Sequence, residues 1–201
     1  MRKYLKDEGS IVISSFIISS VLIVLILSTV TLFINDFYIV KSNENSIKAY
    51  YLAESGANKA LSEIYKEMNQ VIFKYLKELK EYKIAYVQNI NKEEAMKKYM
   101  PPTLEMYLQR EFLLKVDTFD EVVNQPFMNY SYKHSYNIKV NYDALYESID
   151  ILSIGIYNDA KKSIYAKVNL PVMYQEGVDG YNLPKIKVIL PNFEIRPQTF
   201  R

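Results

Sequence analysis

The feature that most constrains this chain is a run of 25 residues, Ser10 to Ile34, that contains no charged side chain. Its centre, Val21 to Leu27, is entirely aliphatic. A helix of this length rises about 38 Å, at about 1.5 Å per residue, which is enough to cross a hydrocarbon core of about 30 Å with some tilt. Serine and threonine hydroxyls within the run can bond back to the helix or face another helix in lipid. The run therefore predicts a transmembrane helix over residues 10–34.

The flanks of this run predict its orientation. Arg2, Lys3 and Lys6 precede it, and basic residues tend to stay on the cytoplasmic side of a membrane. We therefore expect a single-pass protein of the cytoplasmic membrane, with a cytoplasmic N-terminus and an extracytoplasmic C-terminal domain. Cleavage as a secretory signal is not expected, because the apolar run exceeds the usual signal core of about 7–15 residues and no A-x-A site follows it.

The next segment, residues 35–90, has the pattern of a long amphipathic helix. It contains no proline, and Gly56 is its single glycine. Apolar residues recur at steps of three and four, which places them on one helix face. They are Ala57, Leu61, Ile64, Met68, Ile72, Tyr75, Leu79 and Tyr82. We expect an extracytoplasmic helical region over 35–90 whose apolar stripe is covered by its own domain or by a neighbouring subunit.

Two short motifs flank the predicted membrane helix. The sequence Lys6-Asp7-Glu8-Gly9-Ser10-Ile11 places a glycine between a short charged segment and the apolar run. The second motif lies within 49–60 and reads Ala49-Tyr50-Tyr51-Leu52-Ala53-Glu54-Ser55-Gly56-Ala57-Asn58-Lys59-Ala60. Its small residues permit the close approach of another structural element, so a helix crossing point is its simplest interpretation.

Together the two motifs resemble those of type IV minor pilins and pseudopilins of the PilX-like and general-secretion-K-like groups. Gly9 and Ser10 match the site where the prepilin peptidase removes a leader, here residues 1–9. The second motif matches the pattern A-x-x-x-A-E-[AS]-G-x-x-x-A that follows the membrane helix in these groups. The matching residues are Ala49, Ala53, Glu54, Ser55, Gly56 and Ala60. The resemblance covers about residues 1–65.

The resemblance implies a role in assembly rather than catalysis. Its implied partners are other minor and major pilins, the prepilin peptidase, membrane lipid, and a platform protein with its motor ATPase. The implied location is the membrane and then a pilus or the cell surface, and the implied assembly residues are Ser14, Ala53, Glu54, Ser55 and Gly56.

Ser10 and Ser14 depart from the major-pilin pattern, which has phenylalanine and glutamate at these positions. In that family the glutamate offsets the free amine of an adjacent subunit, and an unpaired charge in lipid is costly. A subunit without it suits a priming or tip position.

The remaining chain predicts a helical insertion followed by a sheet. Residues 91–125 are mixed, with a helix over Lys92–Met100, a break at Pro101-Pro102, and a second helix over Thr103–Val116. Residues 126–201 change to period two and predict about four antiparallel strands, over 134–142, 148–157, 164–170 and 186–190. The fold class is therefore α+β: a long N-terminal helix packed on a small antiparallel sheet, with a helical insertion. This is also the arrangement of pilins.

The composition argues against most other functions. The chain has no cysteine, one histidine (His134) and a formal net charge of +2. We therefore expect no catalytic triad, no cofactor, no metal site and no nucleic-acid partner, and we do not predict an enzyme. His134 lies in a strand pattern and is expected to be structural. The alternative function is an ordinary single-pass membrane protein that displays an extracellular binding or sensory domain.

Overall fold

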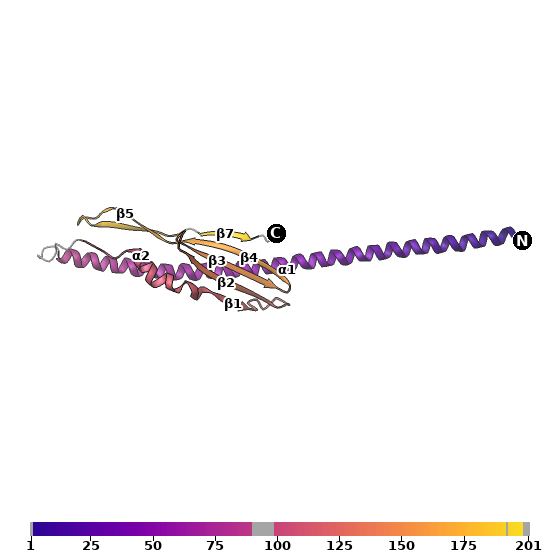
Figure 1. The fold of residues 1–201 in the computed structure, drawn as a ribbon, viewed down its shortest axis with the longest axis horizontal. Helices are drawn as coiled ribbons and strands as arrows, with labels where there is room; N and C mark the ends of the chain where they lie inside the picture. Colours follow the sequence, from indigo (N-terminus) through magenta and orange to yellow (C-terminus); the bar gives the residue numbers. More distant parts are fainter. Residues whose placement is uncertain (1, 90–98, 192, 199–201) are drawn as a thin grey trace. The chain divides into compact units, whose positions relative to one another are not determined.

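The structure is a computed structural model that describes residues 2–89, 99–191 and 193–198, with side chains for residues 10–89, 99–191 and 193–196. It is an α+β fold in which a long helix, α1 (Arg2–Asn89), packs against a small antiparallel sheet, with a short helical insertion (Figure 1). The fold class predicted from the sequence is confirmed. The chain divides into two compact units, residues 1–45 and residues 46–201. We call the second unit the head.

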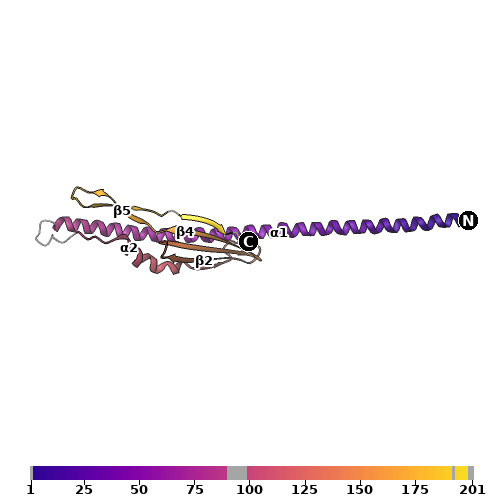
Figure 2. The same ribbon diagram turned by 45° about the horizontal axis from the view of Figure 1, so that its top comes forward.

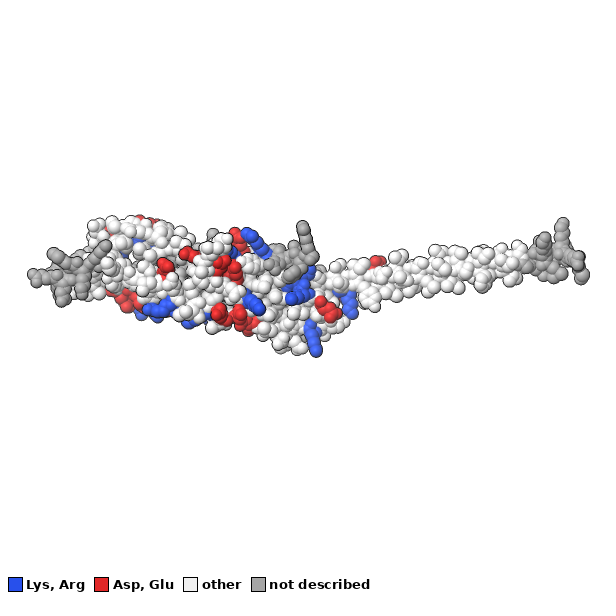
Figure 3. All heavy atoms as spheres, in the orientation of Figure 1, with Lys and Arg blue, Asp and Glu red and all other residues white. Residues whose placement is uncertain are grey.

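In the first unit, every described side chain from Ser10 to Val40 is exposed. Figure 3 shows this segment as an almost unbroken white surface. Four hydroxyls donate to backbone carbonyls three or four residues earlier, at 2.8–2.9 Å; they belong to Ser20, Ser28, Thr29 and Thr31. Such bonds satisfy the hydroxyls within the helix itself, as an apolar surrounding requires. By length and composition, this part of α1 is suited to cross a membrane.

In the head, the rest of α1 buries one face. All seven residues of the predicted stripe from Ala57 to Leu79 are buried, and Tyr82, at its end, is half-buried. Ala49, Leu52 and Ala53 extend the buried face toward Ser46. Figures 1 and 2 show the strands running alongside this part of the helix. The cover that the amphipathic pattern requires is therefore supplied by the head's own sheet.

The main sheet has five antiparallel strands in the order β1-β2-β3-β4-β7. Its centre is formed by β2 (His134–Asp143), β3 (Ser148–Tyr157) and β4 (Ala160–Asn169). These correspond to three of the predicted strands. A two-residue turn joins β3 to β4, with Asn158 at a φ of 51°, a conformation that asparagine adopts more readily than most residues.

The rest of the sheet corrects the prediction of about four strands. β1 (Glu121–Asn124) lies within the range assigned to the helical insertion, and β7 (Phe193–Gln198) was not predicted. The predicted last strand, 186–190, does not join the main sheet. Its residues lie in β6 (Pro184–Ile189), which pairs with β5 (Val172–Val178) as a separate two-stranded sheet. β1 has four residues, too few for an alternating pattern to be recognised, and β5 is exposed along almost its whole length and shows no alternation. In β7 the alternation covers residues 193–196 alone.

The described part of the insertion consists of three short helical turns. They are α2 (Leu104–Tyr107), the π-helix η2 (Leu108–Phe112) and the 3₁₀-helix η3 (Leu113–Phe119). Thr103 caps the first by accepting a hydrogen bond from the Met106 nitrogen. Lys74 on α1 pairs with Glu111 at 2.7 Å and ties the insertion to the helix. The predicted helix over Lys92–Met100 falls largely on residues 90–98, outside the described residues.

Candidate functional site

The small-residue block lies where the sheet approaches α1 most closely. A Cβ atom at Gly155 of β3 would lie 2.1 Å from the Ala49 carbonyl oxygen and 2.4 Å from the Ala53 nitrogen. A Cβ atom at Gly56 would lie 2.4 Å from Ser153 Oγ and 3.0 Å from a ring carbon of Tyr136. Real Cβ atoms do not approach this closely, so any larger residue would force the helix backbone to move at Gly155 and the Ser153 or Tyr136 side chain to move at Gly56. The block is a crossing point between helix and strand, as the physical interpretation predicted.

The motif residues divide between two environments. Ala53 and Gly56 are buried under the sheet, whereas Glu54 and Ser55 are half-exposed on the helix. The small side chains therefore have a role inside the head that needs no partner subunit. Among the residues that match the family pattern, Glu54 and Ser55 are therefore accessible to another molecule, and the exposed side chains of Tyr50, Tyr51 and Asn58 lie in the same block.

The predicted processing site lies at the start of the chain. Gly9 falls in the helical backbone of α1, but side chains before Ser10 lie outside the described ones. Ser10 and Ser14 are both exposed. They are thus accessible in the chain as described, and their proposed parts in cleavage and assembly stay predictions.

A cluster of aromatic rings surrounds His134 at one end of the sheet. His134 is buried; its Nε2 accepts a hydrogen bond from the Phe127 nitrogen at 3.2 Å, and its Nδ1 lies 2.7 Å from the Tyr132 carbonyl oxygen. Because Nε2 accepts, the proton belongs on Nδ1, which then donates to that carbonyl. The neutral ring thereby holds the loop 125–133 against β2. His134 has the structural contacts expected from its strand position.

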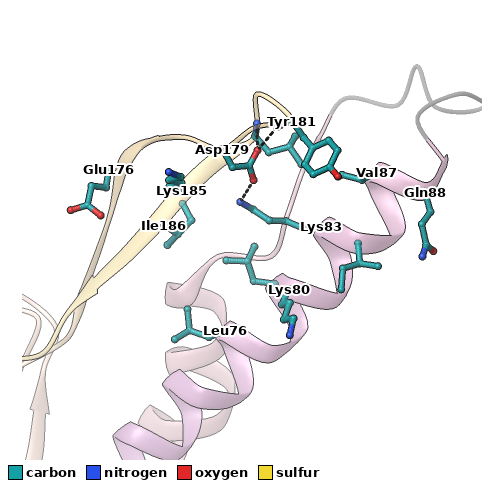
Figure 4. Close-up of a pocket in the computed structure, with 13 residues that line it drawn as sticks. Leu76, Lys80, Lys83, Val87, Gln88, Glu176, Asp179, Tyr181, Lys185 and Ile186 are labelled. Atoms are coloured by element: carbon teal, nitrogen blue, oxygen red, sulfur yellow. Dashed lines mark hydrogen bonds and ion pairs between the residues drawn. The ribbon is translucent and has the colours of Figure 1, made fainter.

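At the other end of the head, α1 and the β5–β6 hairpin enclose a groove of about 680 Å³. Its walls are largely apolar and include Leu76, Leu79, Ile84, Val87, Leu183 and Ile186. Figure 4 shows Lys83 reaching from α1 to Asp179 in the loop between the two strands, where the ion pair measures 3.1 Å. Lys80 and Lys185 also line the groove. Glu176 and Asp179 line it as well, so this apolar groove with charges of both signs at its edge suits an amphiphilic ligand.

Asp179 organises the loop that closes this groove. Its Oδ1 accepts hydrogen bonds from the backbone nitrogens of Tyr181 and Leu183, both at 3.0 Å. The backbone bond from Leu183, with that from Tyr181 and the Lys83 ammonium, holds the pKa of the Asp179 carboxyl below its usual range. The Asp179 carboxylate therefore stabilises the loop itself. Among the described residues, no group of three histidine, cysteine or carboxylate side chains is placed to hold a metal.

Comparisons with protein-family models, with curated proteins and with solved structures find no match to this chain. Function must therefore be inferred from the residues and their geometry. The groove and the partner of the small-residue block, Gly155, were not identified from the sequence. Gly155 could have been noticed because it is a glycine within an apolar strand, and such a glycine often marks a close approach of another backbone.

Proposed function

We propose that this protein is a minor pilin or pseudopilin, an assembly subunit of a type IV pilus or a related secretion machine. The observation that carries the proposal is that one helical element, α1, contains both a fully exposed apolar segment and a segment packed under a small antiparallel sheet. The first segment suits storage in a membrane and then packing among other apolar helices. The second supports a head that can make subunit-specific contacts.

The packing of the motif at 49–60 is a second observation that supports the proposal. Its glycine and alanines let the sheet approach α1 to backbone contact, while Glu54 and Ser55 remain half-exposed. A subunit that must fit into a crowded filament gains from such a thin junction between helix and sheet. In this proposal the prepilin peptidase cleaves after Gly9, and a platform protein with its motor ATPase drives assembly with major and other minor pilins.

Ser14 favours a priming or tip position in the filament. The apolar run from Ser10 to Ile34 offers no carboxylate to offset the free amine of a neighbouring subunit. Burying such an amine without an anionic partner is costly in lipid. A subunit of this kind is therefore better suited to begin the filament, with later subunits added beneath it, than to be added beneath an existing subunit.

A membrane-anchored binding protein is the second candidate, because the groove between α1 and the β5–β6 hairpin offers a place for a ligand. Gly9 distinguishes the two candidates, since only a prepilin requires it.

Filament fractionation tests the proposal directly. An epitope-tagged chain is followed in its own cells by shearing surface filaments and labelling them with immunogold. We expect label at filament ends, and we expect Gly9→Ala to leave the protein in the membrane fraction. Gly180→Ala, at an open position in the head, serves as the matched control and should behave as the wild type. Label spread evenly along filaments would contradict the tip position, and a wild-type chain that never leaves the membrane fraction would contradict the filament role.

A further inference from the structure

One end of the head is built from three segments that bring lysines together. They are the start of the head's helix (46–51), the loop 125–133 and the β3–β4 turn (157–162). The Asn158 nitrogen donates to the Lys133 carbonyl oxygen at 3.0 Å, which joins the loop to the turn. Lys48 Nζ lies 5.0 Å from the ring centre of Tyr157, which joins the helix to the same turn. These contacts place the three segments side by side.

We call this end the basal surface and define it by Lys48, Met128, Tyr132, Lys133, Lys161 and Lys162. The three segments contain four lysines and a single acidic residue, Asp159. Lys133 and Lys161 are exposed, and blue side chains gather at this end of the head in Figure 3. Concentrated positive charge of this kind attracts an anionic partner.

The basal surface also exposes apolar groups. Met128, at the tip of the loop, is fully exposed at 103%, and Tyr132 is 45% exposed. The tip is not loosely held, because His134 accepts the Phe127 nitrogen and the Tyr130 nitrogen donates to the Phe127 carbonyl oxygen at 3.3 Å. The loop thus presents an apolar side chain beside lysines and a tyrosine. That combination is typical of surfaces that sit at a lipid–water interface, where tyrosine and lysine place an apolar body toward lipid and a polar tip toward water.

Chain connectivity keeps this surface close to the apolar run. Lys48 follows Ile34, the last residue of the uncharged apolar run, by 14 positions. That length of chain spans about 21 Å as a helix and at most about 49 Å fully extended, whatever the orientation of the two units. The headgroup region of a bilayer is several ångströms deep on each side of its hydrocarbon core, and charges act over a screening length of about 8 Å.

We propose that the basal surface binds the anionic phospholipid headgroups of the membrane that anchors the chain. This inference rests on the membrane anchor of the proposed function but does not depend on filament assembly. The opposite end of the sheet provides a contrast. The turn joining β2 to β3 exposes Leu145 at 82%, but its neighbours Asp143 and Glu147 are acidic. Lys167 also lies at this turn, with Nζ 4.4 Å from the Tyr146 ring centre. The two carboxylates outweigh this ammonium group, so the tip attracts an anionic surface less than the basal surface does.

The absence of cysteine permits a site-specific test. Full-length Met128→Cys and Leu145→Cys are labelled with a fluorophore and reconstituted into vesicles that contain a lipid-borne quencher. The vesicles are phosphatidylcholine alone or an equal mixture with phosphatidylglycerol. We expect quenching at position 128 at least about twofold stronger in the mixed vesicles, and we expect Lys133→Gln with Lys161→Gln to abolish that difference. Position 145 should be quenched weakly in both.

Vesicle flotation separates failure of the inference from failure of the anchor. A chain that floats with vesicles but is quenched equally at 128 and 145, or independently of lipid charge, overturns the basal surface alone. A chain that does not float overturns the anchor, and with it both the inference and the proposed function. Glutamine at positions 133 and 161 removes the positive charges but keeps the backbone contacts of the loop. If these substitutions abolish the dependence of quenching on lipid charge, that dependence arises from the two lysines.

Discussion

The close approach of β3 to α1 predicts a large effect from a single methyl group. In Gly155→Ala the new Cβ would meet two backbone atoms of α1, at 2.1 Å and 2.4 Å, and Leu52 Cβ at 2.8 Å. Backbone atoms cannot rotate away, so the sheet must move off the helix. Such overpacking costs about 1–3 kcal/mol or more, and the gain of about 0.5–1 kcal/mol from replacing a strand glycine offsets only part of it. We expect a net loss of about 2 kcal/mol.

Thermal unfolding of the full chain in detergent measures this loss. The head's tyrosines provide the signal by near-ultraviolet circular dichroism, because the chain contains 19 tyrosines and no tryptophan. About 2 kcal/mol corresponds to a melting temperature lower by about 4–8 °C for a domain of this size. Gly180→Ala is the matched control, since no atom of the described residues lies within 4 Å of its Cβ. It should change the melting temperature by less than about 2 °C. Equal melting temperatures for Gly155→Ala and the wild type would refute the crossing point.

Three further predictions concern other parts of the head. Gly56→Ala should destabilise the head because its Cβ would lie 2.4 Å from Ser153 Oγ. Adding Ser153→Ala should restore about 1 kcal/mol in a double-mutant cycle. Additive effects of the two substitutions would argue against the contact. Burial, together with the Asp150 carboxylate, raises the pKa of Tyr165 to about 12. Between about pH 10 and 12 the folded head keeps this proton while the unfolded chain loses it, so the free energy of unfolding should fall by less than about 2.7 kcal/mol. Tyr165→Phe should reduce that fall in denaturant titrations. Asp179→Ala should speed amide exchange in residues 179–184, because its carboxylate binds two backbone nitrogens there. In the wild type the same loop should loosen only as the pH falls through the lowered pKa of Asp179, and unchanged exchange in the variant would contradict this role.

The parts of the fold that follow a simple periodicity could be read from the sequence. The stripe on α1 repeats every three or four residues, and the central strands alternate residue by residue, because each buries one face only. His134 could likewise be placed in a strand and assigned a structural role. These predictions needed only local patterns.

The remaining strands could not be predicted because their environment is not local. β7 contains Pro197, which argues against a central strand and is tolerated here because β7 lies at the edge of the sheet. β5 is exposed along almost its whole length, so it shows no alternation. The groove depends on where the β5–β6 hairpin lies against α1, and tertiary packing alone decides that. Gly155 was visible in the sequence, but its contact with Ala49 joins residues far apart in the chain.

The central claim is that this chain is a prepilin, and the most direct test is the mass of its N-terminus. The protein is extracted from membranes of cells with and without a prepilin peptidase, and its intact mass and N-terminal peptide are determined. We expect a chain that begins at Ser10 when the peptidase is present, and an uncleaved chain when the peptidase is absent or when Gly9 is replaced by alanine. A chain that keeps residues 1–9 in the presence of an active peptidase would contradict the account and favour a membrane-anchored binding protein.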